Sequence, residues 1–375
     1  MQIDRRTMLA GAAAAFAVAP AFGQRRAAAS GWYEHAIIID ALGGTGDPYD
    51  ATGTATRMGD RSWNETAATG VTVVRDTVMP VGNVANPWGD YQTDIAAKQA
   101  LLAANPDRLI LVRTAADILK AKREQKFGVV IGTQDTAMVG GELDRLVQMK
   151  KDGVLSVQLT YNNGNLSGDG ALETRNSGLT KLGHATIERI EAEKLLLDLS
   201  HGGARTMAEA AAHARRPFVI SHTGARALID HPRNTADETI RAVSDKGGVT
   251  GVYFMPFLRL GSPATMADVL DHIDHVARVA GEDHVGIGTD NGVLPLGLDE
   301  AARKRQDDYT RQRIKMGIAS PGEAPGIYPW VEELNTIDRY RRVAAALQQR
   351  GWTEARLEKL FGGNFLRVYR DAWGG

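Results

Sequence analysis

The stretch Lys194-Leu-Leu-Leu-Asp-Leu-Ser-His201 is a short apolar run that ends in a histidine, and Phe218-Val-Ile-Ser-His222 repeats this arrangement twenty-one residues later. A third run, His284-Val-Gly-Ile-Gly-Thr-Asp290, ends in an aspartate. Strands that line a barrel are apolar along their length and present functional side chains where they end, so these residues should converge on one mouth. Imidazole and carboxylate groups are ligands that zinc takes in proteins. The three runs therefore indicate a barrel with a metal site at its mouth.

Eight runs of this kind follow one another, and most are preceded by Ala, Leu and charged residues at helical spacing. Helices are expected over residues 207–215 and 266–280, and another should begin after a Thr353 cap and stop at Gly362. Alternation of eight strands with helices is the pattern of a (β/α)8 barrel. The expected strands are residues 35–40, 71–76, 129–134, 155–161, 195–201, 217–222, 248–254 and 284–290.

Composition narrows the class of partner. The chain has 375 residues, 43% of them hydrophobic, and a formal net charge of -1. A (β/α)8 barrel needs about 250 residues, so the length allows one barrel with insertions. Balanced charge gives no electrostatic case for a nucleic acid or an anionic membrane surface. We expect a small-molecule partner.

The amino-terminal residues differ from the rest of the chain. Asp4-Arg5-Arg6-Thr7 leads into an uncharged, alanine-rich stretch from Ala10 to Gly23. This stretch is shorter than the roughly 20 residues that span a bilayer, which favours a removable export signal over a stable membrane anchor. We expect residues 1–29 to be a signal peptide of twin-arginine type and residues 30–375 to form a single barrel domain in a bacterial periplasm. The chain has no cysteine, so only His, Asp, Glu and other oxygen donors could bind metal.

Several motifs occur together in a specific order. They are Asp198-Leu-Ser-His201, Ser221-His222-Thr-Gly-Ala-Arg226, His231-Pro-Arg233-Asn234, Gly286-Ile-Gly-Thr-Asp290 and the closing Gly362-Gly-Asn-Phe-Leu-Arg-Val368. In this order and at these spacings, the chain resembles the membrane (renal) dipeptidase family of the amidohydrolase superfamily. The match runs from about Tyr33 to the carboxyl end.

The resemblance implies a distorted (β/α)8 barrel and, in active relatives, two zinc ions that activate water against the carbonyl of a dipeptide. His201 and His222 match the two histidines that hold one of these metals. Arg233 matches the arginine that binds the substrate, a role that suits its fork of donors toward a carboxylate. Asp290 matches the aspartate that handles the proton of the attacking water. The family also makes a homodimer an expectation.

The chain departs from the family at the other metal. The first strand of the family ends in a His-x-Asp pair, and here Leu42 and Gly44 occupy those positions. Gln134 stands where a bridging glutamate is expected, and Tyr161 stands where active members carry a histidine. Two dications need nearby carboxylates to offset their repulsion, so the loss of these groups favours a single metal.

The predicted site therefore contains one metal ion, zinc or another divalent metal, bound by His201, His222 and a third ligand. Asp135, Asp40 and the Gln134 carbonyl are candidates for that ligand, and Asp290 is preferred because a charged carboxylate binds zinc better. Because a tight ligand is a poor general base, Asp135, Asp76 or Tyr161 could share proton transfer. Gln134 and Tyr161 are expected to line the substrate pocket with Arg233.

The leading hypothesis is an exported metal-dependent hydrolase that cleaves a dipeptide or a small peptide-like amide. The alternative is a periplasmic tailoring or binding protein that acts without hydrolysis on a peptide-derived compound. Structural alternatives also stand: a hydrogen-bonded histidine pair, an ion-paired Arg233 and a loop-fixing Asp290. Residues 294–329, charged and then rich in Gly and Pro, are expected to form a long loop or lid near the site, or an ordinary surface excursion. The sequence leaves the substrate, the metal and the oligomeric state open.

Overall fold

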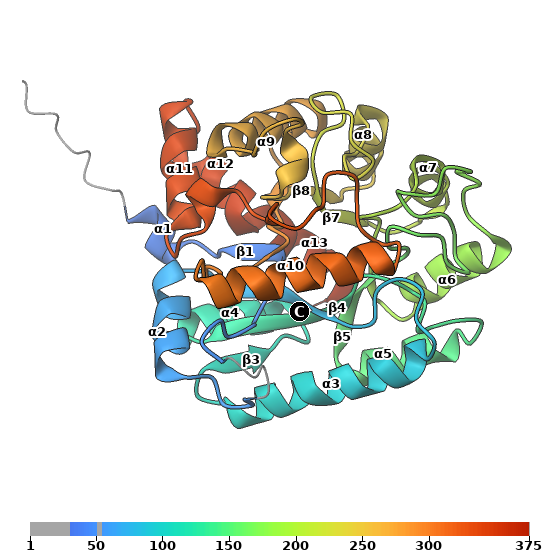
Figure 1. The fold of residues 1–375 in the computed structure, drawn as a ribbon, viewed down its shortest axis with the longest axis horizontal. Coiled ribbons are helices and arrows are strands. Elements are labelled where there is room, and N and C mark those ends of the chain that lie inside the picture. Colours follow the sequence, from blue (N-terminus) through green and yellow to red (C-terminus); the bar gives the residue numbers. More distant parts are fainter. Residues whose placement is uncertain (1–30, 51–54, 375) are drawn as a thin grey trace, which may run out of the picture. The chain divides into compact units, whose positions relative to one another are not determined.

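A computed structural model describes residues 31–50 and 55–374, and its central feature is a curled sheet of parallel strands (Figure 1). The hydrogen-bonded order is β10-β1-β2-β4-β5-β6-β7-β8-β9, and β3 pairs with the outside of β4. The strands are β1 (Ile39–Gly44), β2 (Val73–Val78), β3 (Leu109–Leu111), β4 (Phe127–Thr133), β5 (Val154–Gln158), β6 (Leu196–Asp198), β7 (Val219–Thr223), β8 (Val249–Val252), β9 (Val285–Ile287) and β10 (Asn291–Gly292).

Helices alternate with these strands and pack around the sheet (Figure 1). They are α1 (Trp32–His35), α2 (Asp60–Thr69), α3 (Pro87–Ala104), α4 (Ala115–Arg123), α5 (Asp144–Asp152), α6 (Lys181–Ala192), α7 (Ala204–His213), α8 (Asp237–Asp245), α9 (Met266–Ala280), α10 (Glu300–Lys315), α11 (Arg339–Gln349), α12 (Glu354–Glu358) and α13 (Asn364–Trp373). Three short helical turns complete the set: η1 (Pro256–Leu258), η2 (Glu332–Leu334) and η3 (Lys359–Gly363). The predicted distorted (β/α)8 barrel is confirmed, because each of the eight expected runs contains or overlaps a strand.

The two-residue period of the strands builds the barrel interior in layers. The lower layer is apolar, with Val73, Leu196 and Val219 in one buried cluster with residues of α13. Two residues further along the same strands come Arg75, Asp198 and Ser221, all buried. The inside of the barrel is therefore apolar at the α13 end and polar toward the mouth.

A hydrogen-bonded carboxylate closes the barrel between its first and last strands. Asp40 on β1 accepts hydrogen bonds from the Thr289 amide (2.8 Å) and hydroxyl (2.6 Å) and from the Tyr340 hydroxyl (2.7 Å). The Asp290 amide donates to the Leu42 carbonyl (2.8 Å), and β10 then pairs in parallel with β1. The segment after β9 is thereby fixed against β1, which sets the position of Asp290.

Two expectations about local structure are wrong. The chain does not stop its helix at Gly362 but passes through the π-helical turn η3 into α13. A Cβ on Gly362 would lie 2.0 Å from the Ile37 carbonyl oxygen, so this glycine allows close packing and does not terminate the helix. Within the expected loop 294–329, residues Glu300–Lys315 form α10, an exposed helix capped by Asp299.

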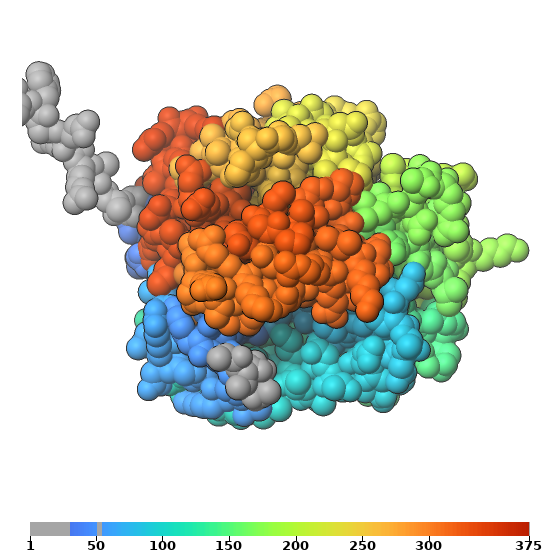
Figure 2. Space-filling view, in the orientation of Figure 1, coloured from blue at the N-terminus to red at the C-terminus, as the bar shows by residue number. Residues whose placement is uncertain are grey.

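The helix α10 and the chain that follows it lie across one face of the barrel (Figures 1 and 2). The predicted export signal, residues 1–29, lies outside the described residues. Within the described part of the chain, no helix combines the length and the apolar character that a membrane crossing needs.

Asp40 gives the fold a testable pH dependence. Burial raises the pKa of Asp40 to about 6, against the effect of its hydrogen bonds. Because the folded state holds this proton more tightly than the unfolded chain, Asp40 should stabilise the fold below about pH 4 and lose that contribution as the pH rises toward about 6. We expect the stability of the wild type relative to Asp40→Asn to fall over this interval by a few kcal/mol, since each tenfold difference in proton affinity between the folded and unfolded chain corresponds to about 1.4 kcal/mol.

The measurement is urea denaturation of both proteins between pH 4 and 7. Tyr369→Phe provides a control, because Tyr369 is a buried tyrosine that makes no hydrogen bond to Asp40. A stability difference that is constant across the interval would contradict this prediction.

Candidate active site

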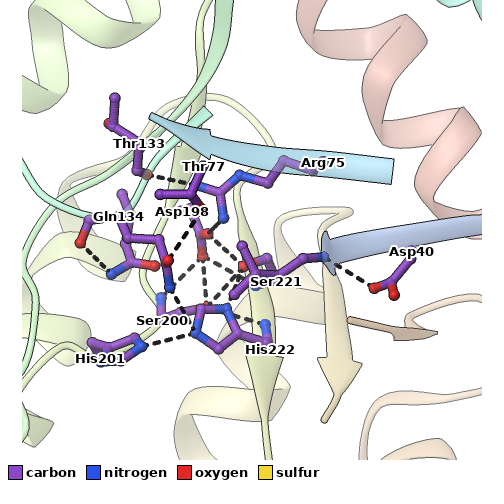
Figure 3. A network of polar contacts seen from close by, with 12 residues as sticks. Asp40, Arg75, Thr77, Thr133, Gln134, Asp198, Ser200, His201, Ser221 and His222 are labelled. Carbon is purple, nitrogen blue, oxygen red and sulfur yellow. Dashed lines mark hydrogen bonds and ion pairs between the residues drawn. The ribbon is translucent and has the colours of Figure 1, made fainter. Parts of the chain in front are cut away.

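The two histidines predicted from the strand ends face each other at the mouth of the barrel (Figure 3). Their Nε2 atoms are 2.8 Å apart, and both side chains are buried. The Tyr161 ring stacks on His201 with 4.2 Å between ring centroids. His201 and Asp290 both have left-handed backbones, with φ of 63° and 59°. Positive φ is uncommon outside glycine and is often found at functional sites, so the conformation agrees with a functional role for both residues.

Hydrogen-bond partners assign the proton on His201. The Asn162 amide nitrogen donates to the Ile318 carbonyl (2.7 Å), which leaves Asn162 Oδ1 to face His201 Nδ1 at 2.6 Å. An amide oxygen can only accept, so Nδ1 of His201 carries the hydrogen. In the neutral ring, Nε2 then bears a lone pair.

The same reasoning applies to His222. Its Nδ1 lies 2.8 Å from Ser221 Oγ, and that hydroxyl donates to Asp198 Oδ2 at 2.5 Å. Because Ser221 gives its only hydrogen to Asp198, Nδ1 of His222 must donate to Ser221. Nε2 of His222 is therefore also an acceptor. Two nitrogen lone pairs face each other at 2.8 Å.

A cation between these nitrogens relieves their repulsion. Burial, followed by the positive charge of Arg233, holds the pKa of both histidines well below the usual value, so a proton is disfavoured there. Metal-binding histidines characteristically donate their other ring N–H to an oxygen, as both do here. The chemistry of the pair thus fits one divalent ion.

The structure does not add a third ligand to this pair. In residues 31–50 and 55–374, no group of three or more His, Asp or Glu side chains is placed to hold a metal ion. Asp290 lines the same cavity as His201 without joining such a group. Its role as third ligand, and zinc as the metal, stay predictions.

The other ligand candidates have structural partners. Asp40 closes the barrel, and Asp135 accepts hydrogen bonds from the Gly82 amide (3.0 Å) and the Asn165 side chain (2.6 Å). Gln134 Oε1 accepts from the Thr77 hydroxyl, so its amide nitrogen lies 3.5 Å from His222 Nε2. These contacts leave His201 and His222 as the candidate ligand pair, with Asp290 as the candidate third ligand.

An internal ion pair lies where the chain departs from the two-metal pattern. Leu42 is buried, and a Cβ on Gly44 would lie 3.9 Å from Asp76 Oδ1. The Lys98 ammonium lies 2.5 Å from Asp76 Oδ2, which also accepts from the Thr45 hydroxyl. The charge of Asp76 is therefore balanced by a lysine, and Asp76 is unsuited to the proton transfer that we considered for it.

A cavity of about 160 Å³ adjoins the histidines and brings together most of the predicted site residues: Gln134, Tyr161, His201, Arg233 and Asp290. Arg233 is 3% exposed, and its Nη2 has no hydrogen-bond partner. No carboxylate among the described residues forms an ion pair with Arg233. For those residues, the alternative that Arg233 serves in a structural ion pair is therefore excluded. A buried guanidinium without a partner is costly, so the cavity is suited to an anionic ligand group.

The helix α10 supplies a second arginine at this cavity. Arg313 Nη1 donates to the Tyr161 hydroxyl (2.9 Å), and Nε pairs with Glu323 (2.7 Å). Since Tyr161 accepts from Arg313, its own hydrogen is available to a ligand. Burial raises the pKa of Tyr161 to about 12, which makes it a donor and a poor base. Burial likewise raises the pKa of Asp290 to about 6, which suits a group that exchanges protons near neutral pH.

Sequence reasoning missed the network beneath the histidines. Arg75 pairs with Asp198 at 3.3 Å between Nη1 and Oδ2, with both side chains almost fully buried, and Arg75 Nη2 donates to the Thr133 carbonyl (2.5 Å). A Cβ on Gly132 would lie 2.3 Å from Arg75 Nε, so that glycine makes room for the guanidinium. The available signal was a charged residue two positions after Val73, on the same face of the strand.

Comparison with known proteins agrees with this geometry. The barrel is of the amidohydrolase type, and the family model "Membrane dipeptidase (Peptidase family M19)" matches residues 90–306 and 316–373. The chain therefore belongs to the membrane dipeptidase family, and it is a dipeptidase-like hydrolase.

Three individual proteins that resemble this chain are each less than 30% identical to it. An uncharacterized protein in the pqqA 5' region of Klebsiella pneumoniae is 29% identical over 290 residues, 74% of this chain and 94% of that protein. Dipeptidase tcpJ of Claviceps purpurea is 26% identical over 277 residues, 73% of this chain and 57% of that protein. An amidohydrolase from Pseudomonas aeruginosa superposes with a TM-score of 0.78 at 29% identity, covering 92% and 98% of the two chains.

The buried ion pair leads to a stability prediction. Replacing Arg75 by methionine leaves the Asp198 carboxylate uncompensated in the barrel, so we expect a loss of about 3–5 kcal/mol in the free energy of unfolding. Asp198→Asn in the same protein should recover part of this loss, because the unpaired charge is gone. Urea denaturation of the two single variants and the double variant measures the coupling. Additive effects would show that the pair does not act as a unit.

Proposed function

We propose that this protein is an exported hydrolase that cleaves a dipeptide or a small peptide-like amide at a mononuclear divalent metal site, with zinc as the expected ion. The observation that carries the proposal is the convergence of two acceptor Nε2 atoms, 2.8 Å apart, beside a buried Arg233 without an ion-pair partner among the described residues. His201 and His222 would hold the ion. When bound, the ion supplies Lewis-acid chemistry to a substrate carbonyl and acidifies water.

Protein side chains supply the remaining binding and proton-transfer roles. Arg233 binds the substrate carboxylate and thereby orients the amide in the cavity. Tyr161, held by Arg313, donates its hydroxyl hydrogen toward the substrate, and Gln134 lines the wall beside His222. Asp290 takes the proton from the attacking water and delivers it to the leaving amine. Asp198 and Ser221 keep His222 in the tautomer that leaves Nε2 free.

The proposed location is the periplasm. The arginine pair Arg5-Arg6 and the uncharged stretch that follows it support export through a twin-arginine route. A homodimer is the proposed assembly, on the resemblance to the family alone.

Metal content tests the proposal directly. We expect the purified protein to bind about one zinc ion per chain and His201→Ala to abolish this binding, because one imidazole is a poor site. His213→Ala, a partly exposed histidine on α7, is the control and should keep the ion. Elemental analysis and titration with a chromophoric chelator provide the measurement. Asp290→Asn should lose hydrolysis of a dipeptide panel that includes D-residues, and its metal content reports whether Asp290 is also the third ligand.

Other outcomes have definite meanings. Loss of the metal in Asp290→Asn would identify Asp290 as a ligand. Absence of both a bound ion and hydrolysis would contradict the hydrolase proposal and leave the alternative, a non-hydrolytic tailoring or binding protein. The presence of Leu42, Gly44 and Gln134 at the family's ligand positions supports that alternative. Two firmly bound ions would contradict the mononuclear site.

The role of Arg233 is tested through the substrate. Arg233→Met removes charge-assisted hydrogen bonds to the carboxylate, so KM for a dipeptide should rise about 10–100-fold. The same dipeptide with a carboxamide end lacks the anion and should be affected little. Steady-state kinetics on both compounds gives the comparison. An equal loss on the two substrates would show that Arg233 acts on the structure of the site and not on the carboxylate.

A further inference from the structure

A second cavity, of about 640 Å³, adjoins the catalytic cavity. We call it the aromatic cavity. Its walls come from the chain that follows η1 and from the chain that follows α10. The residues used to define it are Phe257, Leu260, Pro263, Ile327, Tyr328 and Trp330. The volume lies within the range of about 300–1,000 Å³ that small-molecule sites occupy.

The two cavities share a wall. Pro256, Phe257 and Ile327 line both of them. The catalytic cavity, at about 160 Å³, has room for only a small group, whereas the aromatic cavity is several times larger. A substrate that is anchored beside the histidines and extends past Pro256, Phe257 and Ile327 reaches the aromatic cavity.

Flat rings line the aromatic cavity. Tyr328 and Trp330 stack with 4.8 Å between centroids and an interplanar angle of 6°. His231 stacks on Phe257 in the same way, with 4.5 Å between centroids and 8° between planes. Aromatic groups favour offset stacking on such faces. Leu260 and Ile327 are 58% and 47% exposed, so apolar surface is open to a ligand.

The arginine and histidine side chains of this cavity already have partners. Arg259 forms two hydrogen bonds with Asp268, of 2.7 and 2.9 Å. Arg303 donates to the Leu298 carbonyl (2.7 Å) and lies 5.5 Å from the centre of the Tyr328 ring. His231 accepts from the Arg233 amide at Nδ1, so its Nε2 donates to the Pro321 carbonyl (2.9 Å). The cavity thus presents aromatic faces and not free arginines to its ligand.

We infer that the aromatic cavity binds a flat aromatic group on the amino-terminal side of a peptide-like substrate. The inference rests on the proposed function for its direction: Arg233 holds the carboxylate, so the substrate can extend only from its other end. The substrate class is then an aromatic-capped dipeptide or a short peptide-like compound with an aromatic head, in place of a free dipeptide.

Binding of three probes tests this inference: Ala-Ala, 2-naphthoyl-Ala-Ala and dodecanoyl-Ala-Ala. Titration calorimetry in the Asp290→Asn background, where turnover is blocked, gives the affinities. We expect the naphthoyl compound to bind at least about tenfold more tightly than Ala-Ala, because a buried ring removes a large apolar area from water. Trp330→Ala should abolish this gain and leave the affinity for Ala-Ala unchanged.

Trp88→Ala is the matched control, since Trp88 also stacks on a tyrosine, Tyr91, at 4.9 Å between centroids but lines neither cavity. It should retain the full gain. Equal affinities for naphthoyl-Ala-Ala and Ala-Ala, or a gain that survives Trp330→Ala, would overturn the inference. Tighter binding of the dodecanoyl compound would also overturn it, in favour of an aliphatic chain.

The outcome is separable from that of the proposed function. Hydrolysis by the wild type and metal content report on the catalytic proposal, whereas the Trp330-dependent gain is an equilibrium measurement that requires no turnover. If the gain in affinity is observed but none of the probes is cleaved, the inference about the aromatic cavity stands and the hydrolase proposal is wrong. If Ala-Ala is cleaved but the gain in affinity is absent, the hydrolase proposal stands and the inference about the aromatic cavity is wrong.

Discussion

The buried carboxylate of Asp198 organises the interior of this barrel. It pairs with Arg75 across the barrel, and it accepts hydrogen bonds from the Ser200 hydroxyl (2.8 Å) and from the amide and hydroxyl of Ser221 (3.0 and 2.5 Å) (Figure 3). Strands β2, β6 and β7 are thereby tied to one charged group. A buried carboxylate is tolerated when its lone pairs accept hydrogen bonds, and Asp198 meets that condition with serines, whereas Nε of Arg75 has no hydrogen-bond partner. Ser221, which donates to Asp198, also accepts the hydrogen of His222 Nδ1. The stability of the barrel and the tautomer of His222 therefore both depend on the Asp198 side chain.

The contacts that support the proposed single-metal site are separate from the first strand. His201 and His222, the proposed metal ligands, are oriented by Asn162 and by Ser221, and none of these contacts involves the first strand. Beside the first strand, Leu42 is buried and the charge of Asp76 is balanced by Lys98, so no second dication is needed there. Substitutions on the first strand therefore leave the orientation of His201 and His222 unchanged, because Asn162 and Ser221 orient the two histidines.

The fold could be predicted from the sequence because its signals are local. Each inner strand is an apolar run that ends in a polar residue, and this pattern located all eight principal strands, although β3 (Leu109–Leu111) and β10 (Asn291–Gly292) were not predicted. The resemblance to the family predicted that His201, Arg233 and Asp290 belong to one site, and all three line one cavity. The Arg75–Asp198 pair could not be predicted, because it joins residues 123 positions apart and depends on the space left by Gly132. The arginine Arg313 was missed for a similar reason: its helix lay in a stretch whose Gly and Pro content indicated a loop.

Those missed elements decide what kind of substrate can enter. The barrel strands supply the reacting groups, but one side of the catalytic cavity is formed by α10, and the neighbouring aromatic cavity is formed by loops after η1 and α10. Such loops can change without loss of the barrel core, since the core is closed by Asp40 and Asp198 independently of them. The position of the reacting groups is thus fixed mainly by buried charge, whereas we infer that selectivity is set by a peripheral segment. That segment is joined to the mouth by Arg313, which donates to Tyr161, and by the hydrogen bonds of Asn162 with Ile318 and Ser320. Within the described residues, this division places the chemistry and the choice of substrate on different parts of the chain, so either could diverge while the other is kept.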